Sequence, residues 1–167
     1  GFRRAVYLGS GANFGAAREG ALKMLEMNAG RIGTIAETYL GLRHGPMSYV
    51  NRETLVVCFV SGDPVVRAYE ADLIKEINRK QLGAVKLLTG PVVPPELVNE
   101  NDVVLEEPAV SALDDGYTAV RNVVVAQLLG FFRCRAEGLR PDSPSDGGVI
   151  NRVVESFTLH SNDSKKR

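Results

Sequence analysis

"RAVYLGSGANFGAAREGALKMLEMNAG" (residues 4–30) joins an apolar run to a helical pattern through a short glycine-rich turn. The run at 4–8 predicts a strand that is buried on both faces, because polar residues do not alternate along it. The pattern at 13–30 predicts a helix that closes at Gly30, a residue typical of helix ends. A buried strand followed directly by a helix is the first half of a β-α-β unit and favours a parallel sheet.

The same alternation of strands and helices continues along the chain. Further strands are predicted at 31–37, 54–60, 84–88 and 102–107. Two further helices are predicted, one from Pro64 to an exit at Gly83 and one from Tyr117 to about Glu137. The fold class is therefore α/β, a three-layer α/β/α sandwich around about five parallel strands in flavodoxin-like order. In such sheets the ligand crevice lies beyond the carboxyl ends of the strands.

The two later helices carry start signals. Asp63 and Pro64 supply an N-cap and a proline at the first helical position, and Asp114 or Asp115 is expected to cap the last helix. The buried face of the helix after Pro64 is predicted to hold Val66, Tyr69, Leu73 and Ile77.

The last helix has an unusual composition. Its segment "YTAVRNVVVAQLLGFF" (117–132) is apolar nearly all round, whereas an outer helix of a three-layer domain should keep a polar face. Either this helix is deeply enclosed within the domain, or it docks on another domain or subunit. The sequence leaves both alternatives open.

Length and composition limit the classes of function that the chain can have. The chain has 167 residues, enough for one compact domain, with 20 basic and 20 acidic residues. This balance does not resemble the basic surface of a nucleic-acid-binding protein. No apolar run approaches the length of a membrane span, and no secretory signal opens the chain.

Two cysteines are too few for a disulfide framework. Cys58 lies in an apolar strand and is interpreted as a small core residue. Cys134 lies between two arginines, which could lower its pKa, and is expected to be an exposed thiol. Reduced cysteines without a signal peptide predict a cytoplasmic location.

The turn at Gly9, Ser10 and Gly11 is a candidate binding site. Glycines let a ligand approach the backbone, and the free N–H groups of the following helix favour anions. The same G-x-G-x-x-x-G spacing is close to a dinucleotide fingerprint, in which Glu37 would bind a ribose hydroxyl. The plainest alternative is a tight turn needed for packing.

Glu19, Lys23 and Glu26 share one face of the first helix at i, i+4 and i+7 spacing. One interpretation is a carboxylate base with an ammonium group beside it. The other is a solvated row of salt bridges.

His44 lies in the stiff turn "RHGP" (43–46), which holds its imidazole in a defined place. It is a candidate acid/base group, with an exposed structural histidine as the alternative. The loop "VSGDP" (60–64) offers Ser61 to an anion, but Asp63 adds a negative charge there, which favours a capping turn. No cysteine, histidine or carboxylate spacing suggests a metal site.

Taken together, "YLGSGANFGAAREGALKMLE", "AETYLGLRHGP", "TLVVCFVSGDP" and "NRVVESFTL" resemble sugar isomerase (SIS) domains. The likeness runs from about Val6 to Leu159. It is strongest to the second SIS domain of the tagatose-6-phosphate ketose/aldose isomerase group, which includes galactosamine-6-phosphate deaminases. The isomerase half of glucosamine–fructose-6-phosphate aminotransferase is similar but more distant.

The resemblance implies a phosphosugar-binding domain that needs no cofactor. It implies that Glu26 moves the proton, that His44 assists ring opening, and that Glu19 and Lys23 orient or tune the base. Gly9, Ser10, Gly11 and Ser61 are expected to contact substrate. Glu155 stands where the aminotransferase has a lysine, which favours the isomerase and deaminase group.

The resemblance also divides the chain. Residues 1–139 are expected to form the SIS domain, 140–160 to complete the domain or its pocket, and 161–167 to form a disordered tail. Enzymes of this type have two SIS domains, so the expected partner is a missing N-terminal SIS domain or a second copy of the chain. A sugar-phosphate sensor without catalytic activity is the alternative function.

Overall fold

A computed structural model of the chain describes residues 1–145 and 158–160. Its centre is a five-stranded sheet in the order β2-β1-β3-β4-β5, and every neighbouring pair of strands is parallel. The strands are β1 (Arg4–Leu8), β2 (Gly33–Glu37), β3 (Thr54–Phe59), β4 (Val85–Gly90) and β5 (Val103–Glu106). This order is the flavodoxin-like order that the sequence predicts.

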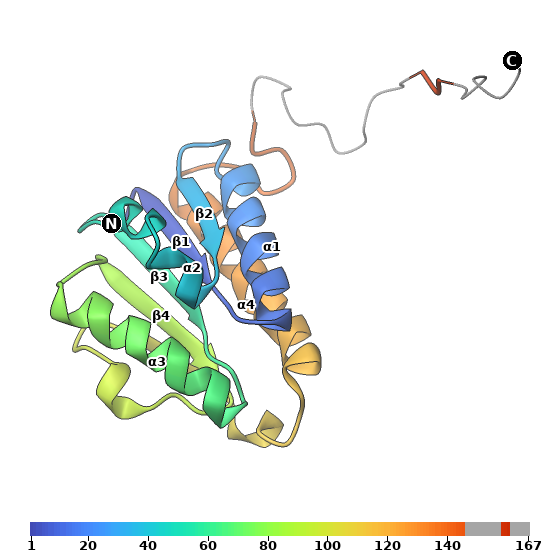
Figure 1. Cartoon of the computed structure of the whole chain (residues 1–167). Helices are drawn as coiled ribbons and strands as arrows, with labels where there is room; N and C mark the ends of the chain where they lie inside the picture. Colours follow the sequence, from blue (N-terminus) through green and yellow to red (C-terminus); the bar gives the residue numbers. More distant parts are fainter. Residues whose placement is uncertain (146–157, 161–167) are drawn as a thin grey trace, which may run out of the picture.

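Helices cover both faces of the sheet and confirm the three-layer prediction. The helices are α1 (Ala12–Met27), α2 (Tyr39–Leu42), α3 (Pro64–Arg79) and α4 (Asp115–Ala136), with 3₁₀ turns η1 (Pro46–Tyr49), η2 (Pro95–Leu97) and η3 (Pro108–Val110). Figure 1 shows α1 and α4 packed together on one side of the sheet, with α2 and α3 on the other.

The strands divide their side chains between two cores. In β1, Ala5 and Tyr7 pack on the α1 and α4 side, while Val6 and Leu8 pack on the α2 and α3 side. All residues of the central strand β3 are buried. This is the pattern of a parallel strand covered on both faces.

The helix starts follow the sequence signals. Asp63 Oδ1 accepts hydrogen bonds from the N–H groups of Val65 at 2.7 Å and Val66 at 3.0 Å, and Pro64 is the first residue of α3. Asp114 caps α4 by accepting from the N–H of Gly116 at 2.7 Å. The cap of α4 is therefore Asp114, which leaves the neighbouring carboxylate of Asp115 free for another role.

The buried face of α3 differs from the prediction at two positions. Leu73 and Ile77 are buried as expected, but Val66 is only half-buried and Tyr69 is 57% exposed, and Glu70 takes the inward position. The buried residues Glu70, Leu73, Ile74 and Ile77 follow i, i+3, i+4 and i+7 spacing, which places Tyr69 beside the stripe. A purely apolar criterion prefers Tyr69 to Glu70 and so shifts the predicted face by one residue.

The prediction for Cys134 is wrong. Its side chain is buried on the core-facing side of α4. This burial raises the pKa of the thiol even though Arg135 lies nearby. Cys58 is buried in β3, as predicted.

The outward side of α4 is open. Tyr117, Val120, Val124, Leu128 and Phe132 are each at least half exposed, so the described part of the chain does not enclose this helix. These five residues are called here the outer α4 row, and their exposure favours the alternative in which this helix docks on another domain or subunit. The edge strand β5 is also exposed along its length, unlike the central strands.

The C-terminal predictions are covered only in part. Within 140–145, Arg140 and Ser143 form an isolated β-bridge. Most of the segment expected at 140–160, including Glu155, and the tail 161–167 lie outside the described residues. None of the helices in the described ranges is long and apolar enough to cross a membrane.

Candidate functional site

The order in which strands are added across the sheet reverses at β1. The chain places β2 on one side of β1 and then crosses to place β3 on the other side. The turn at residues 9–11 and the loop at 61–63 follow these two strands. In open α/β sheets such a switch point is the usual place for a ligand. The predicted residues Gly9, Ser10, Gly11 and Ser61 therefore share one end of the sheet.

The glycine turn is built for close packing. A Cβ at position 9 would lie 2.3 Å from the carbonyl oxygen of Asn13, and Gly11 has a φ of 52° that other residues avoid. A Cβ added at position 15 would meet no atom within 4 Å. In a dinucleotide fingerprint, by contrast, the last glycine lets the helix pack tightly on the strand. The close-packing glycine of α1 is Gly20 instead, so the geometry argues against a dinucleotide site.

The loop at 61–63 is already occupied by carboxylates of the chain. The N–H of Ser61 donates to Glu70 Oε2 at 2.8 Å, and the Ser61 hydroxyl donates to Asp115. The N–H of Gly62 donates to Asp115 Oδ1 at 2.9 Å. Ser61 is fully buried, so its predicted role toward a substrate has no direct support in this geometry.

Glu70 is the most perturbed carboxyl group at this end of the sheet. Burial raises its pKa to about 7, and the nearby Asp115 carboxylate acts in the same direction. The Ser61 N–H, the Ser10 hydroxyl and the Arg67 guanidinium oppose this rise. A strongly shifted buried carboxyl near a switch point is a candidate functional group.

Sequence reasoning missed Glu70, Arg67 and Asp115. A signal existed for Glu70, because it lies in register with Leu73 and Ile77 on the buried stripe of α3. Asp115 was considered only as a helix cap. Its contact with Ser61 spans 54 positions of sequence, and no local pattern predicts a contact of that range.

The row of charges on α1 is confirmed as a connected set. Lys23 Nζ lies 2.7 Å from Glu26 Oε2 and 3.8 Å from Glu19 Oε1. Gln127 of α4 donates to Glu19 at 3.3 Å, so the row lies along the seam between α1 and α4. The hydrogen bond to Glu26 is the main cause that raises the pKa of Lys23, which keeps its ammonium group charged at neutral pH.

His44 is exposed in the turn after α2. The backbone N–H of His44 donates to the carbonyl oxygen of Gly41 at 3.0 Å. Gly45 has a φ of 138°, and Pro46 begins η1. The turn is thus held by its backbone, as the sequence indicates. Arg43, next to it, forms a 3.0 Å ion pair with Glu76 of α3.

Within one chain the predicted residues form three separate groups. Glu26 is on the face covered by α1 and α4, whereas His44 follows α2 on the opposite face. Gly11 and Glu26 lie at opposite ends of α1, roughly 22 Å apart at about 1.5 Å per residue. The three groups therefore do not form one site within a single chain.

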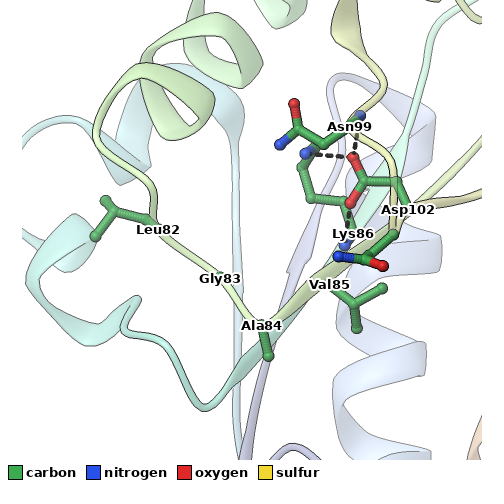
Figure 2. A pocket seen from close by; sticks show the side chains of 8 residues that line it. Leu82, Gly83, Ala84, Val85, Lys86, Asn99 and Asp102 are labelled. Carbon is green, nitrogen blue, oxygen red and sulfur yellow. Dashed lines mark hydrogen bonds and ion pairs between the residues drawn. The ribbon is translucent and has the colours of Figure 1, made fainter.

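A small cavity of about 90 Å³ lies at the opposite end of β4. Figure 2 shows Lys86 and Asp102 paired there, with Nζ 2.5 Å from Oδ2. Asp102 also accepts from the N–H groups of Lys86 at 2.8 Å and Asn99 at 2.7 Å. The charges satisfy each other, so this cluster is structural. Among the described residues, no group of His, Cys, Asp and Glu is arranged to hold a metal ion.

No protein-family model matches the chain. A D-galactosamine-6-phosphate deaminase AgaS from Escherichia coli O157:H7 is 37% identical over 159 residues, which cover 95% of this chain and 41% of that protein. An AgaS protein from Shewanella sp. is 33% identical over 158 residues, covering 95% of this chain and 38% of that one. The chain thus spans about two fifths of the length of these curated relatives.

The structure agrees with the sequence comparison. The crystal structure of tagatose-6-phosphate ketose/aldose isomerase from Escherichia coli matches with a TM-score of 0.79 and 35% identity, over 86% of this chain and 38% of that chain. The chain is therefore a sugar isomerase (SIS) domain of the type found in tagatose-6-phosphate ketose/aldose isomerases, consistent with the C-terminal SIS domain of such a protein.

Proposed function

We propose that this domain belongs to an aldose/ketose isomerase that acts on hexose 6-phosphates in the cytoplasm. Tagatose 6-phosphate and galactosamine 6-phosphate are the substrates that the named relatives suggest. The observation that carries the proposal is the pairing of Glu26 with Lys23 on a half-buried flank of α1.

The pair suits the proton transfer that this reaction needs. After ring opening, the Glu26 carboxylate takes the proton from the carbon beside the carbonyl and returns it to the neighbouring carbon of the enediol. The Lys23 ammonium, 2.7 Å from Glu26, places positive charge where the intermediate develops negative charge. With a 2-amino sugar, the same shift produces an imine, and its hydrolysis by water releases ammonia.

The phosphate group needs donors that this chain does not offer at residues 61–63. The N–H of Ser61, the hydroxyl of Ser61 and the N–H of Gly62 are all bonded to Glu70 or Asp115. A phosphate there would meet two carboxylates. We therefore assign phosphate binding to a different SIS domain, since a second copy of this chain would carry the same occupied loop.

The outer α4 row is the surface that this partner covers. It runs along α4 beside the seam that holds Glu19, Lys23 and Glu26. A partner seated on the row would bury its apolar side chains and would also enclose Glu26 away from bulk water. The same partner could bring a histidine to Glu26, since His44 of the same chain lies on the far face.

The test follows proton exchange in heavy water by NMR. The chain alone and the longer parent protein are incubated with each sugar phosphate, and deuterium uptake beside the carbonyl is recorded. Glu26→Gln and His44→Ala should abolish exchange by the parent protein. Glu100→Gln and His160→Ala, at exposed positions, serve as matched controls and should keep it.

The chain alone is expected to exchange slowly or not at all, because its phosphate donors are occupied. Saturable binding of a sugar phosphate to the parent protein without any exchange would contradict the isomerase proposal. That outcome would favour the alternative of a sugar-phosphate sensor.

A further inference from the structure

Two carboxylates hold one serine where the loop at 61–63 meets the first turn of α4. Ser61 donates its N–H to Glu70 and its hydroxyl to Asp115. Asp115 also accepts from the N–H of Gly62 at 2.9 Å, so it holds the loop at two points. Because Asp115 is the first residue of α4, this contact anchors the start of that helix to the end of β3.

Glu70 is the member of this cluster whose charge can change near neutral pH. It is 1% exposed, and its Oε1 atom has no hydrogen-bond partner among the described residues. Burial raises its pKa to about 7. A proton on the unpaired oxygen neutralises Glu70 while Oε2 keeps its bond to the N–H of Ser61.

Groups from every neighbouring element face Glu70. They are Ser10 before α1, Tyr39 of α2, Cys58 of β3, Arg67 of α3 itself and Asp115 of α4. Tyr39 and Cys58 are buried, and burial raises the pKa of both, so they stay neutral. The Arg67 guanidinium donates to the carbonyl oxygens of Ser61 and Gly62, each at 2.9 Å. One nitrogen of the Arg67 guanidinium is therefore bonded to the backbone of the loop, whether or not Glu70 is ionised.

We propose that the proton on Glu70 controls how firmly Asp115 holds the first turn of α4 against the loop at 61–63. When Glu70 is protonated, Asp115 is the one negative charge beside Ser61, and it keeps its hydrogen bonds to the loop. Without the proton, two negative charges flank the same serine. Asp115 is the carboxylate that moves away from Ser61, because it is only half-buried and can turn toward water. Glu70, by contrast, lies on the buried side of α3.

The anchor matters because α4 carries the outer α4 row. Three further hydrogen bonds hold this half of the helix. Arg121 donates to Thr89 Oγ1 at 2.8 Å and to the carbonyl oxygen of Leu105 at 3.1 Å, and Asn122 donates to Asn13 Oδ1 at 2.9 Å. Release of Asp115 therefore loosens the first turn, with Tyr117, and leaves α4 in place from Arg121 onward. The meaning of the switch for partner docking rests on the proposed function, but its existence does not.

Amide hydrogen exchange of the 167-residue chain, measured by NMR at pH 6 and pH 8, tests the switch. The reporters are the amides of Gly62, Tyr117 and Thr118, corrected for the intrinsic effect of pH, and the amide of Val57 in β3 monitors global unfolding. We expect protection of the three reporters to fall at least fivefold from pH 6 to pH 8, since each pKa unit of coupling is worth about tenfold. Glu70→Gln should keep them protected at both pH values, and Asp72→Asn, an exposed control on α3, should behave like the wild type.

An equal fall in the Glu70→Gln chain, or no fall in the wild type, would overturn the proposal. If Glu70→Gln does not fold, the carboxyl carbon of Glu70 is titrated in the wild type and in Asp115→Asn. Removal of the neighbouring charge should lower the titration midpoint of Glu70, and an unchanged midpoint would equally overturn it. No sugar phosphate enters either experiment, so failure of the isomerase proposal leaves the outcome interpretable.

Discussion

The ammonium group of Lys86 lies 2.5 Å from the Asp102 carboxylate, and the two side chains are only 2% and 4% exposed. This ion pair joins β4 to the residue that precedes β5. Asp102 also receives two backbone N–H groups, whereas Nζ of Lys86 has no second partner among the described residues. The pair is therefore asymmetric, and its two halves should respond differently to mutation.

Asp102→Asn should destabilise the fold by about 3–5 kcal/mol, because it leaves a buried cation without its counterion. Lys86→Met should cost at least about 1 kcal/mol less, since Asp102 keeps both backbone donors. Urea unfolding of the two variants measures the difference. A larger loss for Lys86→Met would show that the ammonium group is the better satisfied partner.

Gly20 and Gly15 should respond to alanine in opposite directions. A Cβ at position 20 would lie 2.8 Å from the Tyr7 ring and from Ala126, whereas one at position 15 meets nothing within 4 Å. Gly20→Ala should destabilise by about 1–3 kcal/mol through overpacking. Gly15→Ala should stabilise by up to about 1 kcal/mol through helix propensity. Thermal unfolding of both variants checks the pair, and a stabilised Gly20→Ala would contradict the tight packing of α1 and α4 on Tyr7.

Most of the fold could be predicted because its signals are local. The run of apolar residues in β3, the Asp63 cap and the Pro64 start each act within a few positions. The strand order also follows, because short right-handed connections leave few alternatives for alternating strands and helices.

Contacts among the candidate site residues could be predicted only where a single helix carries them. Glu19, Lys23 and Glu26 are three or four residues apart, so helical geometry alone brings them together. Asp115 reaches Ser61 only because α4 packs beside the end of β3, and Cys134 is buried only because α4 packs on α1 and the sheet. Contacts of that range depend on the whole fold, and residues adjacent in sequence do not report them.

Both cysteines should resist thiol reagents in the folded protein. Burial raises the pKa of Cys58 to about 12 and also raises that of Cys134, so little thiolate forms at pH 8. We expect modification by an aromatic disulfide reagent to be at least about a hundredfold slower than in urea-unfolded protein. One thiol that reacts at the unfolded rate, assigned by mass spectrometry, would contradict the burial of that cysteine.

Charges placed in the outer α4 row should prevent association while the fold survives. Val124 and Leu128 are 51% and 50% exposed, so Val124→Glu and Leu128→Glu remove little buried surface and should shift the melting temperature by only a few degrees. The wild type is expected to self-associate at high concentration, with two copies covering each other's apolar rows. Sedimentation equilibrium should show this association lost in both variants and kept in Lys75→Glu, an exposed control on α3. A wild type that stays monomeric at high concentration would contradict self-association.

The stability of the domain should fall as the pH rises through neutrality. Glu70 has a pKa of about 7 in the folded chain, above the value of 4.5 for the free group, so the folded state binds its proton more tightly. The stabilisation is complete below about pH 4.5 and is lost as the pH rises through 7, up to about 3 kcal/mol for this one group. The quantity that isolates Glu70 is the difference in the free energy of unfolding between the wild type and Glu70→Gln. Urea unfolding at intervals from pH 4.5 to pH 8 should give a wild-type free energy of unfolding that falls relative to the variant. A difference that is constant across this range would mean that Glu70 is ionised in the folded chain throughout.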